Sequence, residues 1–296
     1  MFNKRKSKED IIFDIINYSV LGIVCVAVLY PLYFMIIASF SDPNLVALGK
    51  VWAYPKKITI EGYSRIFNDN SIWTGYKNSL LYAGLGAVVS VTMTITGAYP
   101  LSRKDFYGRN FFMVVFLFTM FFGGGLIPTY LLVKNLHMTN TIWAMVIPGA
   151  VSVWNLIITR TFFQTSIPED LREAASIDGC SDLNFFTKIV LPLSKPIIAV
   201  IALYTIVGQW NGFFDALIYL GKEKMYPLQL ILRNILIQAE PQKGMLIDIE
   251  TLMAKQRAKE LIKYGVIIVS SVPLLTIYPF IQKYFVKGVM IGSIKG

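Results

Sequence analysis

The stretch Glu173-Ala174-Ala175-Ser176-Ile177-Asp178-Gly179 lies in a polar island within a largely apolar chain. It runs on through nine residues to Ile189-Val190-Leu191-Pro192. The whole island is about 25 residues long and separates two apolar segments. An island of this kind is suited to contact a soluble partner rather than lipid or a small molecule.

The composition of the chain is that of a polytopic membrane protein. Of its 296 residues, 55% are hydrophobic and 16% are charged, and the mean hydropathy is +0.55. These values exclude an ordinary soluble protein of this length. The net charge of +10 comes from scattered basic residues, which favours contact with lipid headgroups over nucleic-acid binding. Cys25 and Cys180 lie in different environments, so we expect two free thiols.

Apolar segments of about 20 residues predict an all-α polytopic membrane protein with six transmembrane helices. The predicted spans are residues 18–40, 78–101, 111–133, 141–163, 195–220 and 263–286. The first span lacks a small-x-small cleavage pattern, so we interpret it as an uncleaved span rather than a signal peptide. Gly123-Gly124-Gly125 is expected to break or loosen the third span.

The basic residues favour a cytosolic position for both termini. Lys and Arg are equally numerous on the two faces of this arrangement, so their total does not orient the chain. The compact cluster at residues 4–8, together with Arg103, Lys104 and Arg109, favours an inside N-terminus. The predicted segments are then a cytosolic N-terminus at 1–17, extracellular loops at 41–77 and 221–262, a cytosolic loop at 164–194 and a cytosolic C-terminus at 287–296.

Local signals within the island predict two short helices joined at a glycine. Ser166 precedes Glu169 by three residues, which is the spacing of a capping box. Gly179 is the residue type best able to end the first helix in a left-handed conformation. Ser181 can begin a second helix, which must stop or bend at Pro192. The result is a helix–glycine–helix elbow with its tip in solvent.

The elbow offers small, apolar and acidic side chains to a partner. The alanines allow a close backbone approach, Leu171, Ile177 and Phe185 can fill a groove, and Glu173 can pair with a basic residue. An amphipathic loop lying on the membrane face is the alternative. The predicted contact residues are Leu171, Glu173, Ala174, Ala175, Asp178 and Gly179.

The pattern Glu-Ala-Ala-x3-Gly-x9-Ile-x-Leu-Pro resembles the coupling loop of membrane subunits of bacterial ATP-binding-cassette (ABC) importers. Residues 121–128, 143–148 and 209–215 resemble the carbohydrate branch, of the maltose type, and within it permeases for complex oligosaccharides. The resemblance covers essentially the whole chain and implies the type I importer permease fold, with a core at residues 77–280 and a cytosolic coupling helix.

The same resemblance implies partners and a location in the bacterial plasma membrane. It implies a second homologous permease, two ATPase subunits, and an external solute-binding protein, a lipoprotein, that delivers an oligosaccharide. ATP and magnesium would belong to the ATPases. In agreement, the chain has no Gly-rich phosphate loop ending in Lys-Ser/Thr, so we expect no cofactor here.

Polar residues within the predicted spans are candidates for the substrate pathway, because such groups are costly in lipid unless they face a partner or a water-filled cavity. Interhelical hydrogen bonding is the alternative for each. These candidates are Asn155, Gln209, Trp210, Asn211 and Asp215.

Other functions find less support in the residues. His137 is the only histidine and has no cysteine or carboxylate cluster beside it, so neither a metal site nor a catalytic triad is expected. The chain is therefore predicted not to be an enzyme. An ion-coupled secondary transporter or channel remains the alternative function, and it would favour more ionisable residues within the spans.

Overall fold

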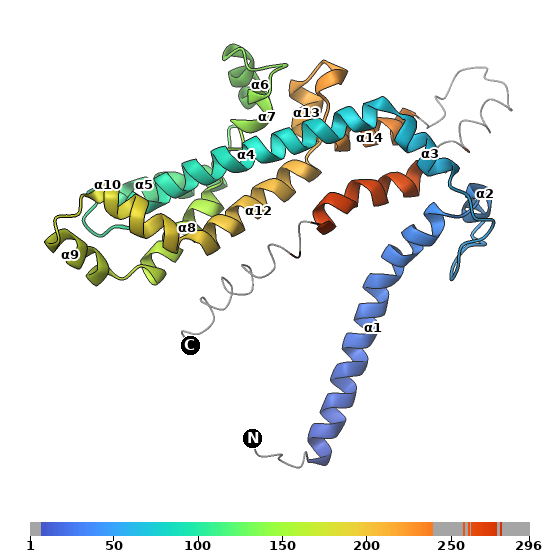
Figure 1. Cartoon of the computed structure of the whole chain (residues 1–296), viewed down its shortest axis with the longest axis horizontal. Helices are drawn as coiled ribbons and strands as arrows, with labels where there is room; N and C mark the ends of the chain where they lie inside the picture. Colours follow the sequence, from blue (N-terminus) through green and yellow to red (C-terminus); the bar gives the residue numbers. More distant parts are fainter. Residues whose placement is uncertain (1–6, 239–256, 258–259, 261, 277–278, 280–296) are drawn as a thin grey trace. The chain divides into compact units, whose positions relative to one another are not determined.

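The computed structural model describes residues 7–238, 257, 260, 262–276 and 279. These residues are mostly helical and include no strand. The chain divides into two compact units, residues 1–69 with 234–271 and residues 70–233 with 272–296 (Figure 1). The second unit contains the whole polar island.

The first unit is built around one long apolar helix, α1 (Lys8–Ser39). Ser7 and Asp10 form a capping box at its start, which satisfies two backbone N–H groups. Nearly all of α1 is solvent-exposed, and only Ile37, Ala38 and Ser39 are buried. An exposed helix that is apolar on all sides is typical of a helix in lipid. The other helices that begin in this unit are α2 (Pro43–Ala47), α3 (Glu61–Asn68) and a helix over Ile262–Thr276.

The second unit has α4 (Asn70–Ser102) as its central element. Helices α5 (Arg109–Phe121), α8 (Val153–Ser166) and α12 (Lys195–Asn211) pack against it. Its remaining elements are short: α6 (Leu126–Asn135), α7 (Trp143–Val146), α9 (Glu169–Ile177), α10 (Asp182–Phe185), the π-helical turn η1 (Phe186–Val190), α11 (Leu191–Leu193), α13 (Phe214–Tyr219) and the 3₁₀ turn η2 (Glu223–Met225). Helix α14 (Leu228–Gln238) begins in this unit.

A row of small residues on α4 makes this packing possible. Gly86, Ser90, Thr94 and Ala98 recur every four residues, and all four are buried. A side chain at Gly86 would meet Gln209 of α12, at 3.3 Å from the added carbon. Thr205 Oγ1 of α12 donates to Ser90 Oγ at 3.2 Å. The small side chains of this row therefore let α12 approach α4 closely.

Two of the apolar segments are broken by sharp bends. Helix α5 ends at Phe121 and α6 begins at Leu126, with a bend of 112° between them. Gly125 has φ +84° at this point, which confirms that the glycine run breaks the segment. The second bend, of 73°, separates Asp182–Leu193 from α12. The segment 141–163 is likewise divided into α7 and α8.

The six-span topology stays a prediction. Within the described residues, α1 and α4 are long and apolar enough to cross a membrane, and each bent pair would add one more span. Parts of the predicted sixth span (263–286), of the loop 221–262 and of the N-terminal segment 1–17, and the C-terminal segment 287–296, lie outside the described residues.

A glycine in α4 tests the packing of this unit. At Gly75, an added Cβ would lie 2.7 Å from Ile231 Cδ1 and 2.9 Å from the Leu228 backbone. Gly75→Ala is therefore expected to destabilise the protein by about 1–3 kcal/mol through overpacking. Gly84→Ala, in the same helix, meets nothing within 4 Å and should be neutral or stabilising by up to about 1 kcal/mol. Unfolding midpoints in detergent measure both effects, and equal midpoints for the two variants would contradict this packing.

Candidate functional site

The first arm of the elbow is α9, a nine-residue helix that ends at a left-handed glycine. Gly179 has φ +75°, and the N–H of Cys180 donates to the carbonyl of Ala175 at 2.9 Å. This geometry confirms the predicted glycine cap. The predicted capping role of Ser166 is wrong, because α9 begins after Pro168 and no side chain caps it. Proline already fixes the backbone at that position, without a side-chain acceptor.

The second arm begins at Ser181 and turns sharply into α12. The N–H of Asn184 donates to Ser181 Oγ at 3.4 Å, as predicted for a helix start. The arm continues through α10, η1 and α11 and bends by 73° just after Pro192, where Ser194 Oγ donates to the Val190 carbonyl at 2.6 Å. The predicted bend near this proline is confirmed.

The outer face of the elbow is open. No residue of α9 is buried, and Ile177 is 87% exposed. Of the predicted contact residues, Leu171, Glu173, Ala174, Asp178 and Gly179 are exposed, whereas Ala175 is half-buried against the apolar core.

Phe185 does not belong to this open face. It is 2% exposed and lies in the core of the second unit with Phe163 and Val190. Its predicted role in filling a partner's groove is wrong, because α10 turns this ring inward as the anchor of the elbow.

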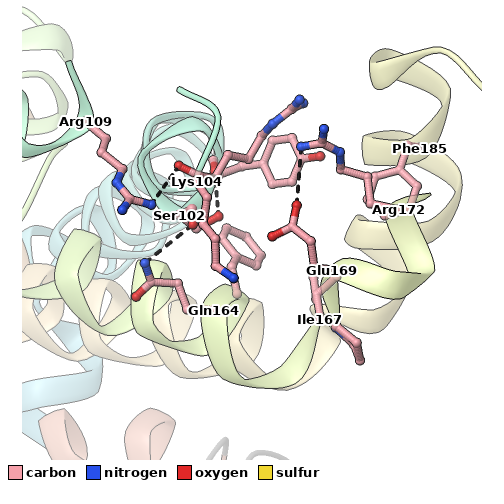
Figure 2. A pocket seen from close by; sticks show the side chains of 12 residues that line it. Ser102, Lys104, Arg109, Gln164, Ile167, Glu169, Arg172 and Phe185 are labelled. Carbon is pink, nitrogen blue, oxygen red and sulfur yellow. Dashed lines mark hydrogen bonds and ion pairs between the residues drawn. The ribbon is translucent and has the colours of Figure 1, made fainter. Parts of the chain in front are cut away.

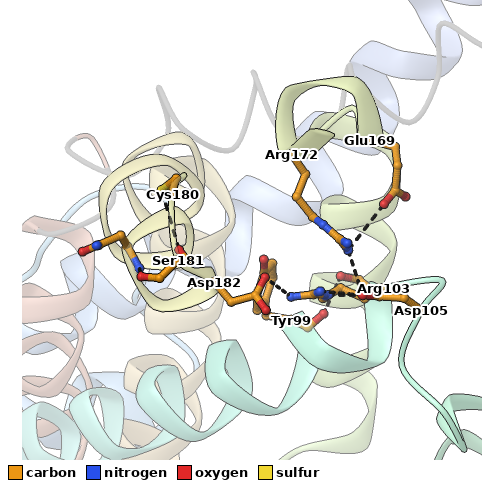
Figure 3. Close-up of polar contacts among 10 residues, drawn as sticks. Tyr99, Arg103, Asp105, Glu169, Arg172, Cys180, Ser181 and Asp182 are labelled. Carbon is orange, nitrogen blue, oxygen red and sulfur yellow. Dashed lines mark hydrogen bonds and ion pairs between the residues drawn. The ribbon is translucent and has the colours of Figure 1, made fainter. Parts of the chain in front are cut away.

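A cluster of ion pairs holds the inner face of the elbow (Figure 3). Arg103, in the turn between α4 and α5, contacts Asp105 and pairs with Asp182 of α10 at 2.7 Å. Arg172 of α9 pairs with Asp105 at 3.1 Å and with Glu169 at 3.6 Å. One carboxylate, that of Asp105, thus joins two arginines from different elements.

The cluster shifts the titration of its members. Hydrogen bonding from Arg103 is the largest cause that lowers the pKa of Asp105 well below its usual value, and Arg172 lowers it further. The same bond to Asp105 raises the pKa of Arg103. Asp105 therefore stays ionised, and the cluster intact, over the whole physiological pH range.

Side chains from neighbouring elements also satisfy the last carbonyl groups of α4. Arg160 Nε donates to Leu101 O at 2.9 Å, and Gln164 Nε2 donates to Ser102 O at 3.4 Å. Arg109 Nη1 donates to the carbonyl of Arg103 at 3.3 Å. Cationic groups at a helix C-terminus also oppose the negative end of its dipole. The bonds from Arg160 and Gln164 fasten α8 to the end of α4, and the bond from Arg109 ties the start of α5 to the turn that follows α4.

A second feature, at the other end of α8 and α12, is a cavity of about 420 Å³ lined by both polar and apolar groups. Its lining includes Asn155, Gln209 and Asp215, three of the predicted pathway residues. Gln209 Nε2 donates to Met145 O at 2.9 Å. Two exposed aromatic rings, Trp154 and Tyr204, line the cavity as well.

The other two predicted pathway residues lie elsewhere. Trp210 is 2% exposed, and its ring packs on Tyr76 with centroids 5.8 Å apart. Asn211 is exposed, and its Nδ2 donates to Val207 O within α12 at 3.0 Å. Neither lines the cavity.

Comparison with known proteins identifies the family. The model of the family described as "Binding-protein-dependent transport system inner membrane component" matches residues 70–291. The chain belongs to this family. The resemblance to ABC importer permeases in the Glu-Ala-Ala pattern is thereby confirmed, and an ion-coupled transporter or channel is not favoured.

Relatives of this binding-protein-dependent permease cover nearly its full length. Two are from Bacillus subtilis (strain 168): Protein LplC, 38% identical over 98% of this chain and 97% of the relative, and the polygalacturonan/rhamnogalacturonan transport system permease protein YtcP, 39% identical over 96% and 99%. A solved bacterial ABC transporter involved in alginate import is 32% identical, with a TM-score of 0.85 over 96% of this chain and 100% of that chain.

The sequence alone does not predict the ion-pair cluster. Arg103 contributes only to the predicted orientation of the chain. Asp105 and Arg172 carried no prediction. The usable signal was the alternation of charges around the polar island, but partners 79 residues apart, such as Arg103 and Asp182, cannot be paired without the fold. Among the described residues, no group of three potential metal ligands occurs.

Replacing the shared carboxylate tests the cluster. Asp105→Asn should loosen α9, because Arg172 keeps only the longer contact to Glu169. Amide hydrogen exchange of α9 at pH 7 is expected to rise by about fivefold, equivalent to ~1 kcal/mol for a partly exposed pair in a network. Asp178→Asn, which removes a carboxylate without an ion pair among the described residues, is the matched control.

The pH dependence follows from the lowered pKa of Asp105. Asp105 contributes fully to the stability of the elbow above pH 3.8, which is the pKa of this carboxyl in the unfolded chain. The contribution is lost as the pH falls below that value toward the lowered pKa of the folded state. Wild-type α9 should therefore keep its protection down to about this pH. Equal exchange in Asp105→Asn and wild type at pH 7 would rule out the cluster as the support of the elbow.

Proposed function

We propose that this chain is a permease subunit of an ATP-binding-cassette importer that moves oligosaccharides across the bacterial plasma membrane. The observation that carries the proposal is an exposed Glu-Ala-Ala helix, anchored on its inner face, in a member of a binding-protein-dependent transport family. Relatives named for polygalacturonan/rhamnogalacturonan transport and alginate import support a carbohydrate cargo.

The proposed assembly contains subunits beyond this chain. A second homologous permease would complete the pathway, two ATPase subunits would bind ATP and magnesium, and an extracellular solute-binding protein would deliver the sugar. This chain would hold no cofactor and carry out no hydrolysis. Its six spans would place both termini and the elbow in the cytosol.

The outer face of the elbow is proposed to dock in a groove of an ATPase subunit. Leu171 and Ile177 supply exposed apolar surface, and the Glu173 carboxylate supplies a charge for a basic partner residue. Ala174 and Gly179 leave room for close contact. Ala175 and Asp178 complete the set at the C-terminal end of α9, with Ala175 facing partly inward.

Movement of the elbow would reach the pathway through the two helices that flank it. Helix α8 lines the cavity with Trp154 and Asn155 at its start and holds the end of α4 with Arg160 and Gln164. Helix α12 leaves the elbow at Lys195 and lines the cavity from Tyr204 to Gln209. A displacement of α9 would thus move both walls of the cavity.

The cavity is proposed to form this subunit's share of the substrate pathway. Asn155, Gln209 and Asp215 offer hydrogen-bonding groups for sugar hydroxyls, and exposed aromatic rings suit the apolar faces of sugar rings. Trp210 and Asn211, outside this lining, are not retained in the proposal.

Glu173→Lys tests the docking role. Because the charge is reversed on an exposed face, the chain should reach the membrane in normal amounts while oligosaccharide uptake falls at least tenfold, ~1.4 kcal/mol. Substrate-stimulated ATPase activity of the reconstituted complex should fall in parallel. Glu223→Lys makes the same charge change on an exposed turn, η2, away from the elbow and should import normally. Normal uptake by the Glu173 variant would refute the assignment.

Asp215→Asn tests the pathway role. Loss of the carboxylate acceptor should reduce uptake by about fivefold, ~1 kcal/mol for one hydrogen bond, without changing ATPase association. Asn211→Ala, four residues earlier and outside the cavity lining, should leave uptake unaltered. Radiolabelled oligosaccharide uptake in vesicles distinguishes the two variants. Equal losses of uptake would show that Asp215 serves helix packing rather than substrate contact.

A further inference from the structure

Beside the elbow lies a second cavity, of about 300 Å³, whose walls are rich in cations (Figure 2). It is bounded by the end of α4, the turn to α5, the end of α8 and the start of α9. Its lining carries four cationic side chains and one carboxylate, that of Glu169. The cations are Arg103, Lys104, Arg109 and Arg172.

Two of these cations are not neutralised. Arg103 and Arg172 share the carboxylates of the ion-pair cluster. Among the described residues, neither Lys104 nor Arg109 has a carboxylate oxygen within 4.0 Å. Arg109 uses Nη1 on the Arg103 carbonyl, and a guanidinium carries five N–H groups in all. Donors and positive charge therefore remain for an anion.

The negative end of the α4 dipole does not oppose this assignment. The carbonyls of Leu101, Ser102 and Arg103 are already satisfied by Arg160, Gln164 and Arg109. On the opposite wall, Pro168 and Glu169 belong to the start of α9, which no side chain caps. The start of a helix is its positive end.

Exposed aromatic residues near the cavity favour a position at the level of lipid headgroups. Tyr107, in the same turn as Lys104, is 98% exposed, and Phe111 at the start of α5 is 67% exposed. Aromatic rings at the end of an apolar helix are typical of the membrane–water interface. Basic residues at such a position attract anionic lipids.

We propose that this cavity binds the phosphate of an anionic phospholipid headgroup between Lys104 and Arg109. A headgroup there would bridge the α4–α5 turn and the start of the elbow. The lipid composition of the inner leaflet would then adjust how firmly α9 is held. The binding itself does not depend on the proposed transport function; its effect on coupling does.

The test uses the full chain purified with its partner subunits. Native mass spectrometry should show retention of phosphatidylglycerol in preference to phosphatidylcholine. Lys104→Gln should weaken phosphatidylglycerol binding about fivefold, equivalent to ~1 kcal/mol for one cation near the membrane surface. Lys195→Gln, an exposed cation at the start of α12 and outside the cavity lining, is the matched control. Arg109→Gln is the second variant and Arg109→Lys its charge-conserving partner.

Three outcomes would overturn the proposal. The first is equal binding of the two lipids, or equal losses in Lys104→Gln and Lys195→Gln. The second is saturable binding of inorganic phosphate alone at the site, which would assign it to free phosphate. The third is retention of phosphatidylglycerol only after the ATPase subunits are removed, which would assign the cavity to a protein contact. Lipid binding is measured without a transport assay. A failure of the transport proposal can therefore be distinguished from a failure of the lipid-binding proposal.

Discussion

Close packing against α4 is the constraint on which the second unit depends. The backbones of two helices can approach closely only where side chains are small, and α4 supplies that surface at Gly86, Ser90, Thr94 and Ala98. At Gly97, an added Cβ would meet Leu156 of α8 at 3.2 Å. Both α8 and α12 therefore lie along α4, although the polar island separates them in sequence. The position of the elbow follows, because these two helices are its flanks.

Ion pairs and a few apolar contacts together hold the elbow. Helix α9 buries no residue, so its position depends on Arg172, the half-buried Ala175 and the Phe185 anchor in α10. Exposed ion pairs contribute little one at a time. Arg103 is only 18% exposed and contacts two carboxylates, and such a shared, partly buried network orients its members more than it stabilises the fold. Orientation is what a docking surface requires.

The sequence predicted the local features of the elbow better than its attachments. Gly179, Ser181 and the bend near Pro192 follow from backbone preferences of single residues, which hold in any fold. The break at the glycine run before α6 also follows from the backbone preference of single residues. The prediction that Ser166 caps the first helix is wrong because Pro168 starts that helix instead. The prediction that Phe185 contacts a partner is wrong because periodicity does not show which apolar side chain of a short amphipathic segment faces the protein's own core.

The sequence pattern does not show which residues the fold brings together at the cavity. Asn155, Gln209 and Asp215 meet at one cavity, while Trp210 and Asn211, between two of them in sequence, point elsewhere. Residue type favoured all five equally, and the packing of α8, α12 and α13 in the fold decides which of them line the cavity. Helix α12 is long enough to run from the elbow to the cavity. A helix is stiff along its axis, since each backbone hydrogen bond links neighbouring turns. In the proposed coupling, a push on the elbow would therefore be carried along α8 and α12 to the cavity walls.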